Sequence, residues 1–137
     1  TFKEKEENYS IEEKIKNDDI NDSPKLLLHQ GTLRSGESLE AEGDVLLLGD
    51  VNPGAKISAG GDVMIWGRLL GIAHAGKGGN ITSKIVALQF RPLQLRIAHK
   101  VARGPEEKPE PGLAEEACIQ SDNIIIQPAR TNSFKRE

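Results

Sequence analysis

The sequence predicts an all-β fold, specifically a right-handed three-sided parallel β-helix with about 18 residues in each coil. Three observations predict it: an internal repeat of 18 residues, glycines that divide each repeat into three segments, and apolar residues that alternate within those segments. A chain that returns to the same point every 18 residues and advances by one strand each time forms a β-solenoid.

The repeat is clearest when residues 36–53 are aligned with residues 54–71. Six of the 18 positions are identical, and four more are apolar in both copies. The alignment extends over residues 26–97 and so predicts four stacked coils. The identical pairs are Gly36/Gly54, Ala41/Ala59, Gly43/Gly61, Asp44/Asp62, Val45/Val63 and Gly49/Gly67.

Glycines divide each repeat into steps of seven, six and five residues, which predicts three corners per coil. Glycine suits a corner because a sharp turn often needs a positive φ. The sides between corners are long enough for strands but too short for stable helices. The crossover rule for parallel strands favours right-handed winding. The uneven steps disfavour the left-handed helix of strict six-residue repeats.

Apolar residues at every second position predict the inward face of each side, because alternate side chains of a strand share a face. The same frame places Leu27 one coil below Val45, and Ile81 one coil above Val63. The inward residues expected to stack are Leu39 on Ile57, Ala41 on Ala59, Val45 on Val63, Leu47 on Ile65, and Leu33 on Val51 and Leu69.

The rest of the chain completes one β-helix domain, expected over residues 24–129. Residues 82–96 predict strand, because Pro92 interrupts any helix and the segment is β-branched and aromatic. Residues 103–112 predict an exposed loop, and residues 118–127 a last strand laid on the prism. Residues 1–23, with twelve charges, predict a flexible linker, and residues 130–137 a frayed tail.

The composition argues against several classes of protein. A net charge of −3 gives no field that would gather nucleic acid or an anionic membrane. The longest apolar runs have four residues, far below the roughly 20 that cross a bilayer. The single cysteine, Cys118, has no partner for an internal disulfide, which favours a reducing, cytoplasmic compartment.

One side of the expected prism carries apolar residues where outward positions should be polar. These residues, which we call the apolar panel, are Leu46, Leu48, Met64 and Trp66, and Leu28 extends it. An exposed panel of this kind usually marks a partner. We predict that it forms an isologous homodimer interface. The alternative is that residues 82–96 or the final strand cover it.

The sequence holds no arrangement typical of catalysis, so we expect neither an enzyme nor a cofactor or metal site. Residues 71–77 have the spacing of a phosphate-binding loop, but Gly78 replaces the Ser or Thr that holds magnesium, and a turn is expected there. Asp44 and Asp62 follow corner glycines and are expected to cap turn amides. The three histidines lack metal-ligand spacing and are expected to be structural or exposed: His29, His74 and His99.

The motifs of residues 31–37, 43–55, 59–67 and 71–79, in this order, resemble the C-terminal domain of the septum site-determining protein MinC family. The resemblance spans roughly residues 26–128. It implies a cell-division regulator that homodimerises and binds the membrane-associated ATPase MinD, so that FtsZ ring assembly is inhibited through the full-length protein. Membrane contact is implied only indirectly, through MinD.

The resemblance also implies a MinD-binding site. The family motif Arg-Ser-Gly-Gln is matched here by Arg34, Ser35 and Gly36, with Glu37 in place of the glutamine. Two other classes remain open: a bactofilin-like cytoskeletal β-helix that assembles into filaments, and a left-handed hexapeptide-repeat acyltransferase with a catalytic histidine at a trimer seam.

Overall fold

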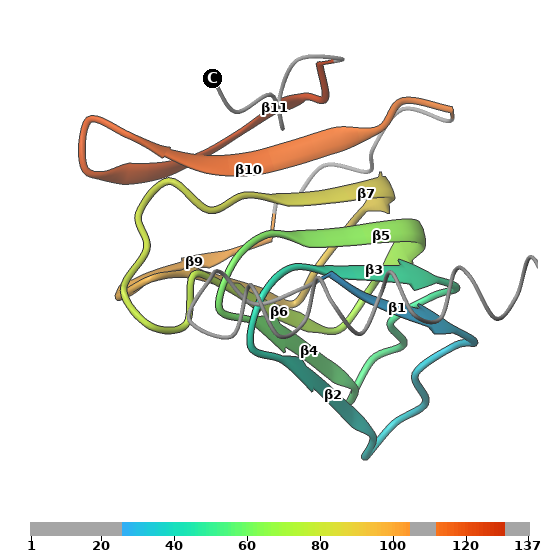
Figure 1. Cartoon of the computed structure of the whole chain (residues 1–137). Helices are drawn as coiled ribbons and strands as arrows, with labels where there is room; N and C mark the ends of the chain where they lie inside the picture. The colour runs from blue at the N-terminus through green and yellow to red at the C-terminus, as the bar shows by residue number, and fades with distance from the viewer. Residues whose placement is uncertain (1–25, 105–111, 131–137) are drawn as a thin grey trace, which may run out of the picture.

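The computed structural model describes residues 26–104 and 112–130, and these residues form eleven strands in two sheets and no helix (Figure 1). The expected linker at residues 1–23 lies outside the described residues, as do residues 105–111 of the expected loop and nearly all of the expected tail.

The two sheets form two sides of a prism. The first sheet contains β1 (Leu27–Gln30), β3 (Val45–Leu48), β5 (Val63–Leu69), β7 (Ile85–Phe90), β10 (Glu115–Gln120) and β11 (Asn123–Pro128), in that spatial order. The second sheet contains β2 (Ser38–Ala41), β4 (Lys56–Ala59), β6 (Ile72–Ala75), β8 (Gln94–Ile97) and β9 (Lys100–Arg103).

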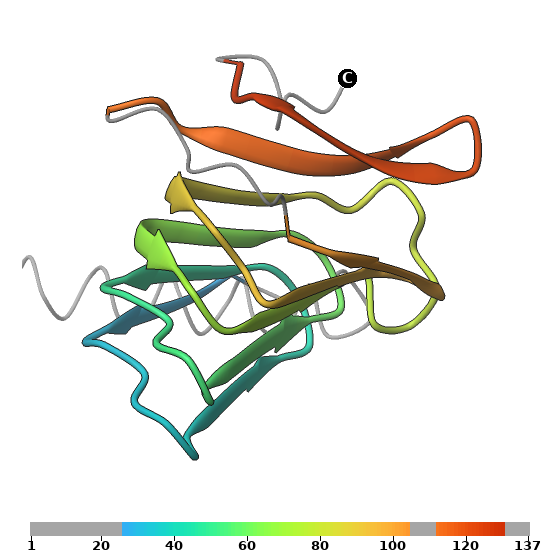
Figure 2. The same cartoon turned by 180° about the vertical axis from the view of Figure 1, so that it is seen from behind.

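The chain winds as a right-handed parallel β-helix, as the sequence predicts. The first four strands of each sheet are parallel, and successive strands alternate between the sheets (Figures 1 and 2). The third side is narrow and consists of single parallel bridges that link Leu33 to Val51 and Val51 to Leu69. Four coils result.

The repeat keeps its 18-residue register through the first coils and then loses it. Leu27 pairs with Val45, and Val45 pairs with Val63, as expected. The prediction that Ile81 lies above Val63 is wrong: Ile85 occupies that place, 22 residues on, and Ile81 is exposed. Lys56 pairs with Ile72 only 16 residues on, and the turn after β6 is then six residues longer than the turn after β4. The next strand therefore begins four residues later than the repeat predicts, without leaving the stack.

The last part of the chain reverses direction, which the sequence analysis did not predict. The single strand expected over residues 118–127 is an antiparallel hairpin of β10 and β11, and β10 also pairs antiparallel with β7. In the second sheet, β9 pairs antiparallel with β8. Two-residue turns make these reversals, at Ala98 with His99 and at Ser121 with Asp122; three of these four residues have a positive φ. Such turns suit tight hairpins because they match the strand twist.

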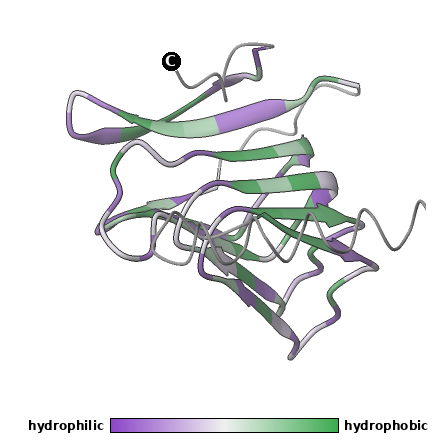
Figure 3. Ribbon diagram, in the orientation of Figure 1, coloured by the Kyte–Doolittle hydropathy of each residue, from purple (hydrophilic) through white to green (hydrophobic). Residues whose placement is uncertain are grey.

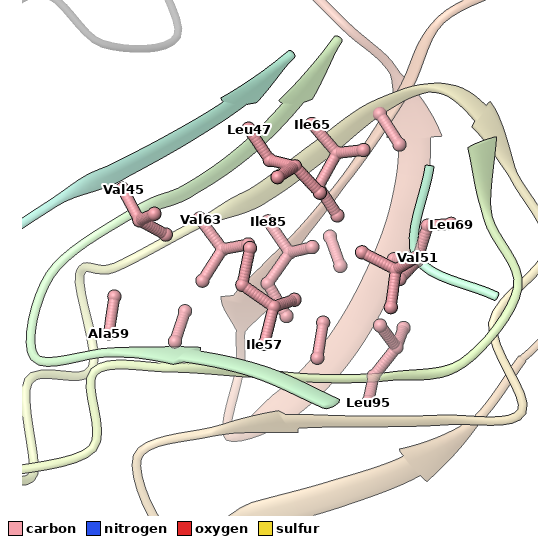
Figure 4. Close-up of a cluster of buried hydrophobic side chains, with 14 of the residues drawn as sticks. Val45, Leu47, Val51, Ile57, Ala59, Val63, Ile65, Leu69, Ile85 and Leu95 are labelled. Atoms are coloured by element: carbon pink, nitrogen blue, oxygen red, sulfur yellow. The ribbon is translucent and has the colours of Figure 1, made fainter. Parts of the chain in front are cut away.

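The core lies between the sheets and follows the columns that the repeat predicts. Val45, Val63 and Ile85 form one fully buried column, and Leu47 and Ile65 lie in a neighbouring one (Figure 4). Hydrophobic residues dominate β3, β5 and β7 (Figure 3). Ile119, Ile124 and Ile126 of the last hairpin pack against this core. The hairpin therefore closes the upper end of the prism.

Candidate functional site

Two surface features of the β-helix are candidate interaction sites. The first is the turn formed by residues 34–37, which we call the corner turn; it leads from the bridge residue Leu33 into β2. The Glu37 amide donates to the Arg34 carbonyl oxygen over 2.8 Å, and Gly36 has a φ of 88°. This is the geometry of a type II β-turn, whose third residue must tolerate a positive φ.

The corner turn stacks on a second turn of the same kind one coil later. Gly36 donates its amide to the Gly54 carbonyl oxygen over 2.9 Å, and the Lys56 amide donates to the Glu37 carbonyl oxygen over 3.0 Å. Gly54 has a φ of 87°. A Cβ at Gly54 would meet the Ser35 side chain, and residues with a Cβ adopt a φ of 87° only at a cost, so glycine is favoured in this stacked turn.

All four residues of the corner turn are exposed, but the side chains of Arg34 and Glu37 differ in what they bind within the chain. The Glu37 carboxylate folds back, and its Oε1 accepts a hydrogen bond from the Arg34 amide over 2.8 Å. The Arg34 guanidinium forms no ion pair with any residue among 26–104 and 112–130. The planar set of N–H donors on such a guanidinium matches the geometry of carboxylate oxygens.

The second feature is the apolar panel, which lies on the outer face of the first sheet. Leu46 pairs with Met64, and both are half-buried, as is Leu48. Trp66 is 65% exposed. Neither β7 nor the final hairpin covers the panel, because these strands lie beside β5 in the same sheet. The alternative that they fold over the panel is therefore wrong.

The structure adds residues that the sequence analysis missed. Val86 pairs with Met64 and continues the panel into β7, where Leu88 is also exposed. Sequence reasoning missed both because it aligned Ile81, rather than Ile85, with Val63. The sequence signal that could have identified Val86 and Leu88 as outward residues is their alternation with Ile85 and Ala87. Leu28, which pairs with Leu46 and is 55% exposed, extends the panel as expected.

The corner aspartates form a ladder between coils, which confirms that they cap backbone amides. The Asp62 amide donates to Asp44 Oδ1 over 2.7 Å, and the Lys84 amide donates to Asp62 Oδ1 over 2.9 Å. A neighbouring side has a related link, in which Asp50 accepts from both the amide and the guanidinium of Arg68. The Arg68 guanidinium holds the pKa of Asp50 below its usual value.

His74 and the glycine-rich segment have structural places. His74 is buried, and its Nε2 lies 3.1 Å from the Ala98 carbonyl oxygen. Burial lowers the pKa of this imidazole. Residues 72–75 form β6, so the spacing that resembles a phosphate-binding loop lies mainly on a strand, and only its end forms the expected turn.

Within the described ranges, no three His, Cys, Asp or Glu side chains gather where they could hold a metal ion. Across those same ranges, no helix has the length and hydrophobicity that crossing a bilayer requires. A cavity of about 510 Å³ lies beside the last hairpin, and Lys84, Glu116 and Cys118 are among the residues that line it. Burial raises the pKa of the Cys118 thiol.

Fold and surface together define a β-helix domain that offers a stacked corner turn and an apolar panel on its outer faces. Residues 27–129 match the model of one family, described as septum formation inhibitor MinC, C-terminal domain. The chain belongs to this family.

Individual relatives agree. The chain is 76% identical over 110 residues to a probable septum site-determining protein MinC of Prochlorococcus marinus strain MIT 9313, covering 80% of this chain and 49% of that protein. A relative from strain SARG is 64% identical over 106 residues, covering 77% and 48%. The chain therefore spans about half the length of these curated relatives.

A solved structure shares the fold. The chain resembles a protein in the MinC:MinD cell division protein complex of Aquifex aeolicus, with 40% identity and a TM-score of 0.70. The match covers 77% of this chain and 87% of that one.

Proposed function

We propose that this domain regulates cell division by binding the MinD ATPase through the corner turn. The observation that carries the proposal is the exposed Arg34 guanidinium on a hydrogen-bonded turn, in a chain whose structural relative was solved within a MinC:MinD complex. Arg34 supplies a planar set of donors, Ser35 a hydroxyl, and Gly36 a place where a partner backbone can approach closely.

We also propose that the apolar panel joins two copies in an isologous homodimer. Burying one Leu or Met side chain contributes about 1.5 to 3 kcal/mol, so pairing Leu46, Leu48, Met64 and Trp66 with their symmetry copies supplies several such contributions. In a twofold arrangement each panel meets itself, so one surface provides both halves of the interface. A dimer then presents two corner turns, which strengthens attachment to MinD on a membrane.

The two sites together suit a targeting module. MinD recruits the dimer from the cytoplasm to the inner face of the membrane, and the full-length protein there inhibits FtsZ ring assembly. On this proposal the domain acts by binding, with neither catalytic residues nor a cofactor, and its membrane contact is indirect.

The MinD proposal is tested by replacing Arg34 with Asp. We expect R34D to abolish ATP-dependent co-sedimentation with MinD on vesicles, because the donors become acceptors and the charge is reversed. R103D is the matched control, since Arg103 is an exposed arginine on β9, in the top coil. Retained binding of MinD by R34D would contradict the proposal.

The dimer proposal is tested by placing a charge in the panel. M64D or W66D should halve the mass measured by light scattering while the circular dichroism spectrum stays that of a β-protein. S38D is the control, because Ser38 is an exposed residue of the second sheet. A dimer mass that M64D and W66D leave unchanged would refute the assignment.

A further inference from the structure

The corner turn is closed by a side chain as well as by its backbone. Two hydrogen bonds join Arg34 and Glu37 reciprocally: the Glu37 amide donates to the Arg34 carbonyl oxygen, and the Arg34 amide donates to Glu37 Oε1, each over 2.8 Å. The Arg34 backbone is thereby held at both its donor and its acceptor. The guanidinium that we assign to MinD binding extends from this fixed point.

The repeat provides an internal comparison, because the turn of residues 52–55 has the same backbone hydrogen bond and the same glycine conformation. The Ala55 amide donates to the Asn52 carbonyl oxygen over 2.9 Å. This second turn has Pro53 at its second position, where the ring fixes φ near the value that a type II turn needs. The corner turn has Ser35 at that position, and Ala55 has no side chain that could act as Glu37 does.

We propose that Glu37 is a positioning residue, which holds the corner turn so that Arg34 is presented to the partner, and that its side chain does not itself contact MinD. The proposal rests on the proposed function for the identity of the partner, but the hydrogen bonds that support it belong to the chain alone. The Oε1 atom is already engaged within the turn. In the next coil, proline restricts the backbone and no such side chain is needed.

Two variants separate the roles of the side-chain oxygen and of its charge. E37Q keeps Oε1 and removes the charge, whereas E37A removes both. Because Glu37 is exposed and no buried contact is lost, both variants are expected to fold.

The experiment measures amide hydrogen exchange at Arg34 by NMR, and MinD binding on vesicles, for each variant. E37A should accelerate exchange and weaken MinD binding about threefold to tenfold, since one hydrogen bond that orders the turn is lost. E37Q should match the parent chain in both measurements.

The outcomes are distinguishable. Unchanged exchange at Arg34 in E37A would overturn the positioning role. So would a loss of MinD binding in E37Q with Arg34 still protected, because the carboxylate itself would then contact the partner. If the parent chain does not bind MinD at all, the proposed function fails. If E37A, but not E37Q, still accelerates exchange of the Arg34 amide in that case, the hydrogen bond by which Glu37 orders the turn is nevertheless supported.

Discussion

Single polar side chains accept backbone amides at the corners, where backbone pairing is interrupted. Asp44 and Asp62 each accept an amide from the coil above, and Glu37 accepts one within its own turn. A buried amide without a partner is costly, so a short acceptor beside each corner removes that cost. His74 of the second sheet makes the opposite kind of link, because its partner is an acceptor, the Ala98 carbonyl oxygen.

The environment of His74 predicts a pH dependence of stability. Burial lowers the pKa of the folded imidazole, and the positive charges of Arg96, Lys56 and Lys77 act in the same direction. The unfolded chain takes up this proton near pH 6.5 and the folded chain does not. The free energy of unfolding is therefore unaffected by His74 above that pH, and decreases as the pH falls below it.

Urea unfolding at about pH 7.5 and about pH 5.5 measures this effect, with H74Q as the control. Glutamine can still donate to Ala98 but does not titrate, so the loss of stability on acidification should be smaller in H74Q. Equal losses in the two proteins would contradict a neutral, buried His74.

Gly67 lies within β5, where the strand passes so close to the coil below that the position requires glycine. A Cβ at Gly67 would lie 2.1 Å from the Gly49 carbonyl oxygen, which belongs to the rigid backbone of the coil below. The stacking of β3 and β5 therefore depends on a missing side chain as much as on the apolar residues that face inward.

G67A should destabilise the domain by about 1 to 3 kcal/mol or more, because the backbone of one coil must move to admit the methyl group. G78A is the matched control: a Cβ there meets nothing within 4 Å, and Gly78 has no positive φ. Thermal unfolding followed by circular dichroism compares them. If G67A melts at the same temperature as G78A, the close approach of Gly67 to the coil below is wrong.

At the scale of the whole molecule, the two ends of the β-helix differ. At the lower end, β1 and β2 are edge strands of the parallel stack. At the upper end, antiparallel strands β9, β10 and β11 terminate the stack, and residues of β10 and β11 pack on the core. A second copy placed head to tail would not continue the parallel register, so the ends do not match for assembly into filaments.

Electron microscopy of the purified chain should accordingly show discrete particles and no filaments. This result would separate the proposed regulator from the bactofilin-like alternative. Filaments that grow without nucleotide or partner would favour the cytoskeletal protein instead.

The repeat made much of the fold predictable, because β-helix stacking is local in sequence. Glycines at corners and alternating apolar residues identify the sides, and an offset of 18 residues identifies which residues stack. The predicted columns of Val45 on Val63 and of Leu33, Val51 and Leu69 are confirmed. The MinD-binding role of residues 34–37 came from a family resemblance, and the dimer role of the panel from exposed apolar residues; both stay predictions.

By itself, the sequence determined the three-sided coil, its inward residues and its corner glycines, since each depends on short-range chain geometry. Only the tertiary structure decided that Ile85 lies above Val63, that Val86 joins the panel, and that residues 115–128 form a hairpin. These features depend on the length of the turn between β6 and β7, and on which strand has an unpaired edge when the chain reaches β10. The tertiary structure also showed that Glu37 closes its own turn with its Oε1 atom, and glutamine has an equivalent side-chain oxygen.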